Sequence, residues 1–376
     1  MFTKEKTNIC KGVAILMLLF HHMFLLENNL IANHMHFYIF PERYIPKIAV
    51  IFRVCVWIFV FLSAYGLTYK FKHSSENRKY GFLSKQWVSL MKPFWFVFVL
   101  ASFAFCLKGE NIIDKHQSSL LLYLIDGLGW ADFIHGPMIS GVFWYMCLAQ
   151  LILLFIPLTY KLLNTLSNYG FISLCFITII VMQVMPDSIR SVYGGGYINY
   201  LPAYLLGCKF AQDDILGKLS SAKITRLKRI IISFILMLLT GVMLIIRYKL
   251  IGNDFFRLGG GMLNSFAALS IVLLFGVYLN ISALSKILMF LGKYSGIMYL
   301  THTLIAALVP QIVYISRFAI INYFANVIES LAVSILCAYL MKWTRYYMML
   351  DRVYDYISQK THNLGLISKN STAANS

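Results

Sequence analysis

Long apolar runs separated by short polar connections constrain this chain most. Each run holds about 15 to 24 residues, and about 20 apolar residues in a helix cross the hydrocarbon core of a bilayer. The alternation of apolar and polar residues typical of a membrane β-barrel is absent. We predict an all-α, polytopic helical membrane protein with about ten transmembrane helices. The predicted spans are 12–26, 48–69, 93–107, 143–160, 170–185, 197–211, 230–248, 262–279, 295–315 and 320–343.

The distribution of basic residues predicts the topology. Of the 33 lysines and arginines, 23 fall on one side if the N-terminus, alternate loops and the C-terminus are placed together, and nine fall on the other. Cytoplasmic loops carry this excess, so both termini are predicted to be cytoplasmic. The net charge of +18 therefore indicates positive-inside bias and anionic lipid, and no nucleic-acid partner is expected.

The chain is predicted to form one membrane-embedded domain over residues 1–350. Residues 351–376 are polar and lack periodicity, which predicts a disordered cytoplasmic tail. The seven cysteines lie mostly in apolar runs without metal-type spacing. We expect neither a metal site nor a disulfide framework.

Two ionisable residues mark the first apolar run. Lys11 and His22 are eleven residues apart, so a helix places them on nearly the same face, about 16 Å apart along its axis. An ionisable group within a membrane span is expensive to bury and is therefore a candidate functional residue. A packed, hydrogen-bonded structural histidine is the alternative interpretation of His22.

A few further polar residues are predicted within or beside spans. Arg53 lies near the outer surface, where it could snorkel to headgroups or bind an anionic or polyhydroxyl substrate. His302 shares a helix face with Ser295 and Tyr299, which fits either hydrogen-bonded packing or catalysis.

Lysines and aromatic residues mark the two membrane surfaces. Lys85 and Lys92 precede Pro93 on the cytoplasmic side, where ordinary helix capping and positive-inside placement compete with a cationic rim for phosphate. Trp144 and Tyr145 lie on the outer side. They are interpreted either as part of an interfacial aromatic belt or as faces for a sugar.

These residues occur in motifs whose order resembles the acyltransferase-3 family over roughly residues 4–345. The motifs are Lys11 to His22, Phe59-Val-Phe-Leu-Ser63-Ala-Tyr-Gly66, Pro93-Phe-Trp95, Phe143-Trp144-Tyr-Met, Leu201-Pro-Ala-Tyr-Leu-Leu-Gly207 and Ser295 to His302. The resemblance implies a ten-helix enzyme that moves an acyl group, usually acetyl, from cytoplasmic coenzyme A thioester to a hydroxyl of an extracytoplasmic or lipid-linked glycan. It also implies a multi-pass protein of the bacterial inner membrane.

The family resemblance implies roles for two of these residues, and the residue patterns above suggest roles for the others. Its first-helix basic residue and histidine match Lys11 and His22, although the family usually has arginine at the first position. His22 is the expected catalytic base. Lys11, Lys85 and Lys92 are the expected donor-binding residues. The candidate acceptor-binding or supporting residues are Arg53, Ser63, Trp144, Tyr145 and His302.

The chain departs from the family pattern at two places. Paired arginines before the third helix are missing, and Ala149 stands where many members have glutamate. The second difference indicates a sub-branch and leaves the identity of donor and acceptor open. Direct transfer and a covalent acyl-enzyme on Ser63 are both possible mechanisms.

We expect no permanently bound cofactor. The expected donor substrate is acyl-CoA, in particular acetyl-CoA, and the expected partners are the lipid bilayer, a carbohydrate acceptor and glycan-assembly proteins. An exporter of a polysaccharide or lipid-linked sugar is the main alternative function. A structural subunit of a glycan-assembly complex is another.

Overall fold

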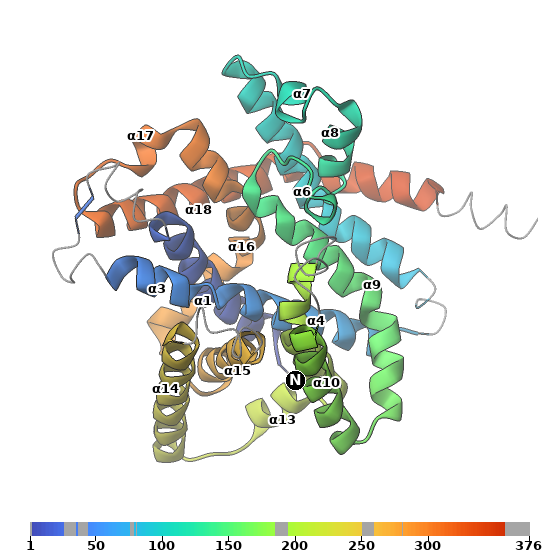
Figure 1. The fold of residues 1–376 in the computed structure, drawn as a ribbon, viewed down its shortest axis with the longest axis vertical. Helices are drawn as coiled ribbons and strands as arrows, with labels where there is room; N and C mark the ends of the chain where they lie inside the picture. Colours follow the sequence, from blue (N-terminus) through green and yellow to red (C-terminus); the bar gives the residue numbers. More distant parts are fainter. Residues whose placement is uncertain are drawn as a thin grey trace, which may run out of the picture.

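The computed structural model describes residues 2–25, 35–36, 44–75, 79, 81–184, 195–249, 259–279 and 281–357, and within these residues the extended regular elements are all helices (Figure 1). The longer helices are α1 Lys4–Phe24, α3 Ile45–Phe52, α4 Cys55–Lys72, α6 Phe82–Leu107, α9 Trp144–Thr165, α10 Asn168–Val184, α12 Leu201–Gln212, α14 Arg226–Lys249, α15 Gly259–Leu273, α16 Ser282–Leu308 and α18 Ala319–Trp343. The shorter ones are α7 Ile112–Lys115, α8 Leu120–Gly127, η2 Asp132–Ile134, η3 Gly141–Phe143, η4 Gly195–Tyr200, α13 Ile215–Ser221, the π-helical η6 Leu274–Tyr278 and α17 Pro310–Val313. This architecture confirms a polytopic helical membrane protein.

Seven helical segments among the described residues are long and apolar enough to cross a membrane. They are Lys4–Phe24, Ile45–Lys72, Phe82–Leu107, Gly141–Thr165, Arg226–Lys249, Gly261–Tyr278 and Ala319–Trp343. The other three predicted spans fall on α10, on η4 with α12, and on α16 with α17. Of these, α10 and α12 are short, and α16 carries Lys286 and Lys293 in its first half.

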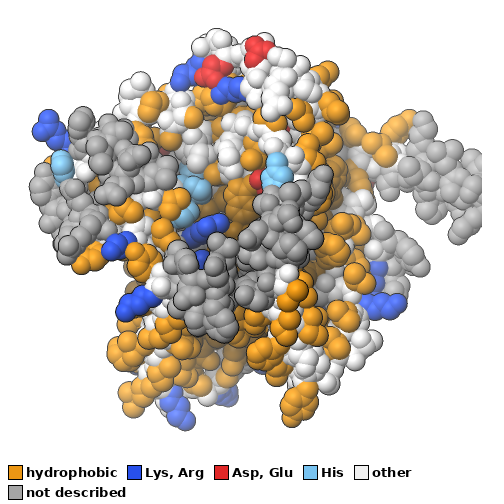
Figure 2. Space-filling model, viewed as in Figure 1, with side chains coloured by type: hydrophobic (Ala, Val, Ile, Leu, Met, Phe, Trp, Pro, Cys, Tyr) orange, Lys and Arg blue, Asp and Glu red, His pale blue; other side chains and the backbone are white. Residues whose placement is uncertain are grey.

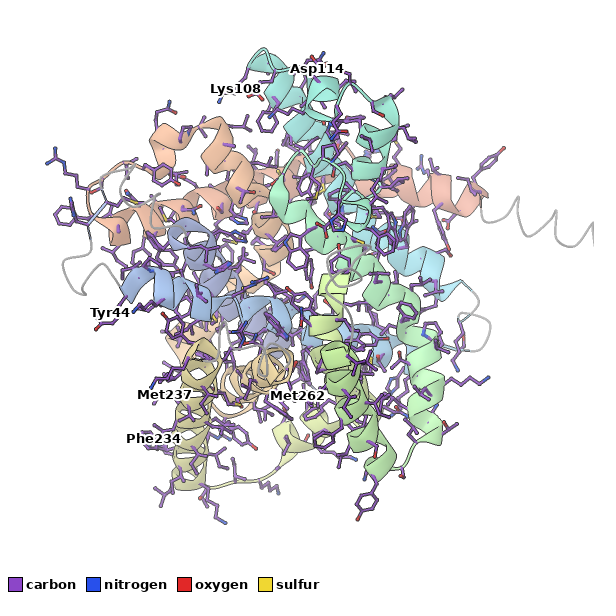
Figure 3. The ribbon with its side chains drawn as sticks, viewed as in Figure 1. Tyr44, Lys108, Asp114, Phe234, Met237 and Met262 are labelled. Carbon is purple, nitrogen blue, oxygen red and sulfur yellow. The ribbon has the colours of Figure 1, made fainter. Side chains whose placement is uncertain are left out.

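Burial separates central helices from peripheral ones. In the most apolar window of Ile45–Lys72, 67% of residues are buried, whereas only 17% are buried in that of α14. Figure 3 shows Phe234 and Met237 projecting from α14 on the side away from α15, and more than half of each side chain is exposed. Because exposed apolar side chains are stable in lipid, α14 faces the bilayer and α4 forms part of the core.

Two glycines allow α1 and α16 to pack very closely. A Cβ atom added at Gly12 would lie 2.1 Å from the carbonyl oxygen of Leu288, and one at Gly292 would lie 1.8 Å from that of Asn8. Small residues permit such backbone contact between membrane helices. The two helices run in the same direction, and the same ten-residue interval separates Gly12 from His22 and Gly292 from His302. The glycine contact therefore brings both histidines to the same depth.

The C-terminal part of the described chain folds back along α6. Residues 346–357 are helical. The Tyr346 hydroxyl donates to the Lys92 carbonyl oxygen at 3.1 Å, and the Tyr354 and Ser84 hydroxyls are 2.8 Å apart. The structure therefore describes the chain as helix through residue 357, within the first part of the predicted tail. Residues 358–376 lie outside the described residues.

Candidate functional site

Three histidines from two helices meet at the outer part of α1. The ring of His22 lies with its centroid 5.0 Å from that of His302 and 5.0 Å from that of His21. His21 is turned away and its Nδ1 lies 2.6 Å from the Ala49 carbonyl oxygen, which ties α1 to α3. No hydrogen bond holds His22 within the described part of the chain. His22 and His302 therefore form the chemically available pair.

The contacts of His302 determine which of its nitrogens carries the proton. Its Nδ1 lies 2.9 Å from the Tyr299 carbonyl oxygen and 3.2 Å from that of Met298. A carbonyl oxygen only accepts, so we infer that Nδ1 is protonated and that Nε2 bears the lone pair in the neutral ring. Nε2 is buried and has no hydrogen-bond partner among the described residues. The pair thus presents an unused acceptor beside His22.

Lys11 lies in the first half of α1, which is predicted to start on the cytoplasmic side, and is partly buried. The ammonium groups of Lys4 and Lys70 are close enough to act on its charge. The helix geometry expected from the eleven-residue spacing is present, because both Lys11 and His22 belong to the uninterrupted α1. Lys4, Lys11 and Lys70 therefore form a cationic cluster, and Lys11 lies about 16 Å along α1 from His22. Sequence reasoning did not include Lys70.

The two other predicted donor-binding lysines lie in different surroundings. Lys85 is exposed in the first turn of α6. Lys92 is buried, and its ammonium pairs with the Asp351 carboxylate of the returning C-terminal helix. Lys92 is therefore engaged by a carboxylate in this structure, and its role in donor binding stays a prediction.

Aromatic and hydroxyl groups connect the histidines to the outer surface. The rings of Tyr145 and Tyr299 lie 5.2 Å apart, and that of Tyr299 lies 6.2 Å from His302. The Tyr145 hydroxyl lies near Ser63 but has no hydrogen-bond partner among the described residues. The structure therefore brings Ser63 and Tyr145 into one neighbourhood with His302.

Trp144 belongs to an aromatic wall. Its ring stacks on Tyr197, with centroids 6.2 Å apart and planes inclined by 12°, and on Tyr200 at 5.8 Å and 27°. Tyr200 also contacts Trp57 at 4.6 Å. The Tyr197 hydroxyl donates to Asp132. These contacts order an amphipathic surface that combines flat apolar faces with polar edges.

Arg53 stands between α3 and α4, beside the histidines. Its guanidinium lies within reach of the Tyr200 hydroxyl, and its charge acts on both His21 and His22. The side chain is exposed. Figure 2 shows Lys or Arg side chains next to histidines near the middle of one face, surrounded by hydrophobic side chains.

A buried network of hydrogen bonds holds the connection between α6 and α9 against α16. The Ser140 and Thr303 hydroxyls are 2.8 Å apart. The neighbouring Ile139 N–H donates to the Asp126 carboxylate at 2.8 Å, and His116 Nε2 lies 3.1 Å from the same oxygen. Burial raises the pKa of the Asp126 carboxyl.

Sequence reasoning missed these groups because they lie in a connection between spans. Their pairing joins residues up to 163 positions apart, as in the contact of Ser140 with Thr303. Local periodicity carries no signal of such a contact. Among the described residues no cluster of three or more His, Cys, Asp or Glu could hold a metal ion, and all seven cysteines are free.

The chain belongs to the acyltransferase-3 family, since the sequence model of that family, described as an acyltransferase domain, matches residues 6–343. The match confirms the family resemblance and shows an integral membrane acyltransferase. Searches of curated proteins and of solved structures gave no match.

Proposed function

We propose that this protein moves an acyl group, in particular acetyl, from cytoplasmic acyl-CoA to a hydroxyl of an extracytoplasmic or lipid-linked glycan, with His22 as the general base. The observation that carries the proposal is the arrangement of three residues. Lys11 and His22 lie on one helix, and the ring of His302, whose buried Nε2 has no hydrogen-bond partner among the described residues, lies beside His22. The bacterial inner membrane is the proposed location.

In the proposed reaction the cationic cluster around Lys11 holds the donor phosphates, and the thioester reaches outward along α1. The acceptor hydroxyl donates its proton to a ring nitrogen of His22 while its oxygen attacks the thioester carbonyl. The tetrahedral intermediate then collapses, the C–S bond breaks, and the coenzyme A thiolate receives the proton from the imidazolium. Atoms and charge balance without a further reactant.

His302 acts as a positioning residue in this scheme. The ring centroids, 5.0 Å apart, allow the N–H of His22 to donate to His302 Nε2 after a small rotation of the His22 side chain. This hydrogen bond would hold the other nitrogen of His22 unprotonated and directed at the acceptor. The aromatic wall of Trp144, Tyr197 and Tyr200 is suited to the face of a sugar ring.

The test measures release of coenzyme A by purified protein in proteoliposomes supplied with acetyl-CoA and an envelope extract as acceptor. His22→Ala should slow transfer about 10²- to 10⁴-fold, the usual contribution of a positioned base. The matched control is His73→Ala, which removes an exposed histidine at the end of α4. His302→Ala should slow transfer less and displace its pH profile.

A His22→Ala protein that inserts normally and retains wild-type activity would refute the assignment. If wild type consumes no thioester with any short acyl donor, the export function becomes the better proposal. Flux of a glycan without coenzyme A would then be the next measurement.

A further inference from the structure

A small pocket beside the histidines carries two arginines. It encloses about 180 Å³ between α3, with its C-cap residue Arg53, and helices α14 and α15. Arg53, Arg247, Tyr248 and Asn264 provide its polar lining, and aliphatic side chains provide the rest. Asn264 is almost completely buried, so its amide is held by the protein and faces little water.

Among the described residues, no acidic side chain in the lining compensates the charges of this pocket. The two guanidinium groups are close enough for the charge of Arg53 to act on that of Arg247. Nε of Arg247 is buried and has no hydrogen-bond partner among the described residues. Like charges brought together in a partly desolvated place repel each other, and an anion between them would remove that repulsion.

The chemistry of the lining selects one kind of ligand. Guanidinium groups donate two parallel hydrogen bonds to carboxylate or phosphate oxygens, and the Asn264 amide and Tyr248 hydroxyl can add further donors. The volume suits one such group rather than a whole sugar chain. The pocket is therefore shaped to hold a single oxyanion.

The position of the pocket connects it to the transfer site. Arg53 lines the pocket and its charge also acts on His22. Arg247 is in the last turn of α14, at the end that the charge distribution assigns to the outer surface. An anion bound here would thus stand on the outer side and beside the proposed base.

We infer that the acceptor carries an oxyanion, either a sugar carboxylate or a phosphate, which Arg53 and Arg247 bind so that a neighbouring hydroxyl reaches His22. This inference rests on the proposed function, because it specifies the class of acceptor for the same site. It adds Arg247, which the sequence did not mark, and gives a role to Asn264.

Binding is measured by calorimetry on the full chain in nanodiscs of zwitterionic phosphatidylcholine. The probes are glucuronate, inorganic phosphate and neutral glucose. Loss of one charge-assisted contact should raise the Kd of the preferred anion about 10- to 100-fold in Arg53→Gln and Arg247→Gln. Comparison of glucuronate with phosphate distinguishes the two sources of the oxyanion.

Lys249→Gln is the matched control, because it removes the same charge from an exposed residue two positions further along α14. It should bind like wild type. Equal anion binding by Arg247→Gln and Lys249→Gln would overturn the inference, as would glucose binding as tightly as both anions. Arg247→Lys should recover part of the affinity, because it restores charge without the planar fork.

His22→Ala separates this inference from the proposed function. The variant should bind the anion with the wild-type Kd even though it cannot transfer the acyl group. Normal binding in an inactive His22→Ala enzyme would support both the pocket and the base. Loss of binding in Arg247→Gln together with active thioester release in His22→Ala would leave the pocket assigned and refute the base.

Discussion

Replacing Gly292 with alanine tests whether the contact between α1 and α16 sets the distance between the two histidines. The added Cβ atom would lie 1.8 Å from the carbonyl oxygen of Asn8. Contacts below 3.0 Å are essentially never made by a Cβ atom, so the gap must widen by at least 3.0 − 1.8 = 1.2 Å. The obstacle is backbone, so no side-chain rotation relieves it and the helices themselves must move.

The movement reaches the site because the helices are stiff. His302 lies ten residues beyond Gly292, about 15 Å along the same helix. A shift near 1 Å in a catalytic arrangement can reduce the rate about 100-fold. Overpacking of a tight contact costs about 1–3 kcal/mol of stability. We therefore expect Gly292→Ala to release coenzyme A about 100-fold more slowly than wild type and to melt at a lower temperature.

Gly296→Ala provides the matched control on the same helix. No atom lies within 4 Å of the Cβ that this change would add, so it should leave both activity and melting temperature near the wild-type values. Coenzyme A release and thermal unfolding are measured on both variants in the same proteoliposome preparation. Wild-type activity in Gly292→Ala would show that the glycine contact does not control the histidine pair.

Other variants test the surroundings of the site. Lys11→Ala should raise the KM for acyl-CoA about tenfold with a smaller change in kcat, as expected for a lost phosphate contact, whereas Lys11→Arg should retain donor affinity. Asp351→Ala should change the free energy of unfolding by less than about 1 kcal/mol, because 61% of the Asp351 side chain is exposed. It should also leave the KM for acyl-CoA unchanged. A lower KM would indicate that Lys92, once released from Asp351, binds the donor. Asp126 faces His116, and its pKa is raised by burial. The protonated Asp126 carboxyl therefore stabilises the folded protein at pH values below its ordinary pKa of about 3.9. This stabilisation is lost as the pH rises through the raised pKa of the folded state. The melting temperature of wild type should consequently fall with rising pH in this range relative to that of Asp126→Asn, and parallel pH profiles would contradict the assignment.

Local patterns in the sequence were sufficient for the fold class but not for helix ends. The predicted span 93–107 is the apolar end of α6, which begins at Phe82. The first turns of α6 contain Lys85 and Ser84, so a hydropathy window does not include them although the helix is continuous. The same reason explains why α16 begins at Ser282, well before the predicted start at residue 295.

Local spacing was also sufficient for part of the site. Lys11 and His22 share one helix, so their relation follows from helix geometry alone. The meeting of His22 with His302 depends on which helices pack together, and the sequence indicated only the helix face that His302 shares with Ser295 and Tyr299. Gly12 and Gly292 create that contact, but a glycine in an apolar run does not reveal its partner.

Arg247 shows why the anion pocket was not predicted. An arginine at the end of an apolar helix is ordinarily interpreted as an outer-loop cation or as a side chain that snorkels to headgroups. Its significance follows only from Arg53, which belongs to a different helix pair and faces the same 180 Å³ space. Arg53 and Arg247 form a candidate binding site only because tertiary packing brings them to the same pocket.

The depth of the histidine pair has a consequence for how the two substrates meet. The hydrocarbon core is about 30 Å thick, and His22 lies about 16 Å from the cationic cluster at the inner end of α1. In the predicted topology, His22 therefore stands about halfway through the core. A donor held at Lys11 needs to reach only about half of the core, and an acceptor anchored at Arg53 lies beside His22. In the proposed reaction the small, uncharged acyl group alone passes from one side to the other, so the large electrostatic cost of moving coenzyme A or an anionic glycan through lipid does not arise.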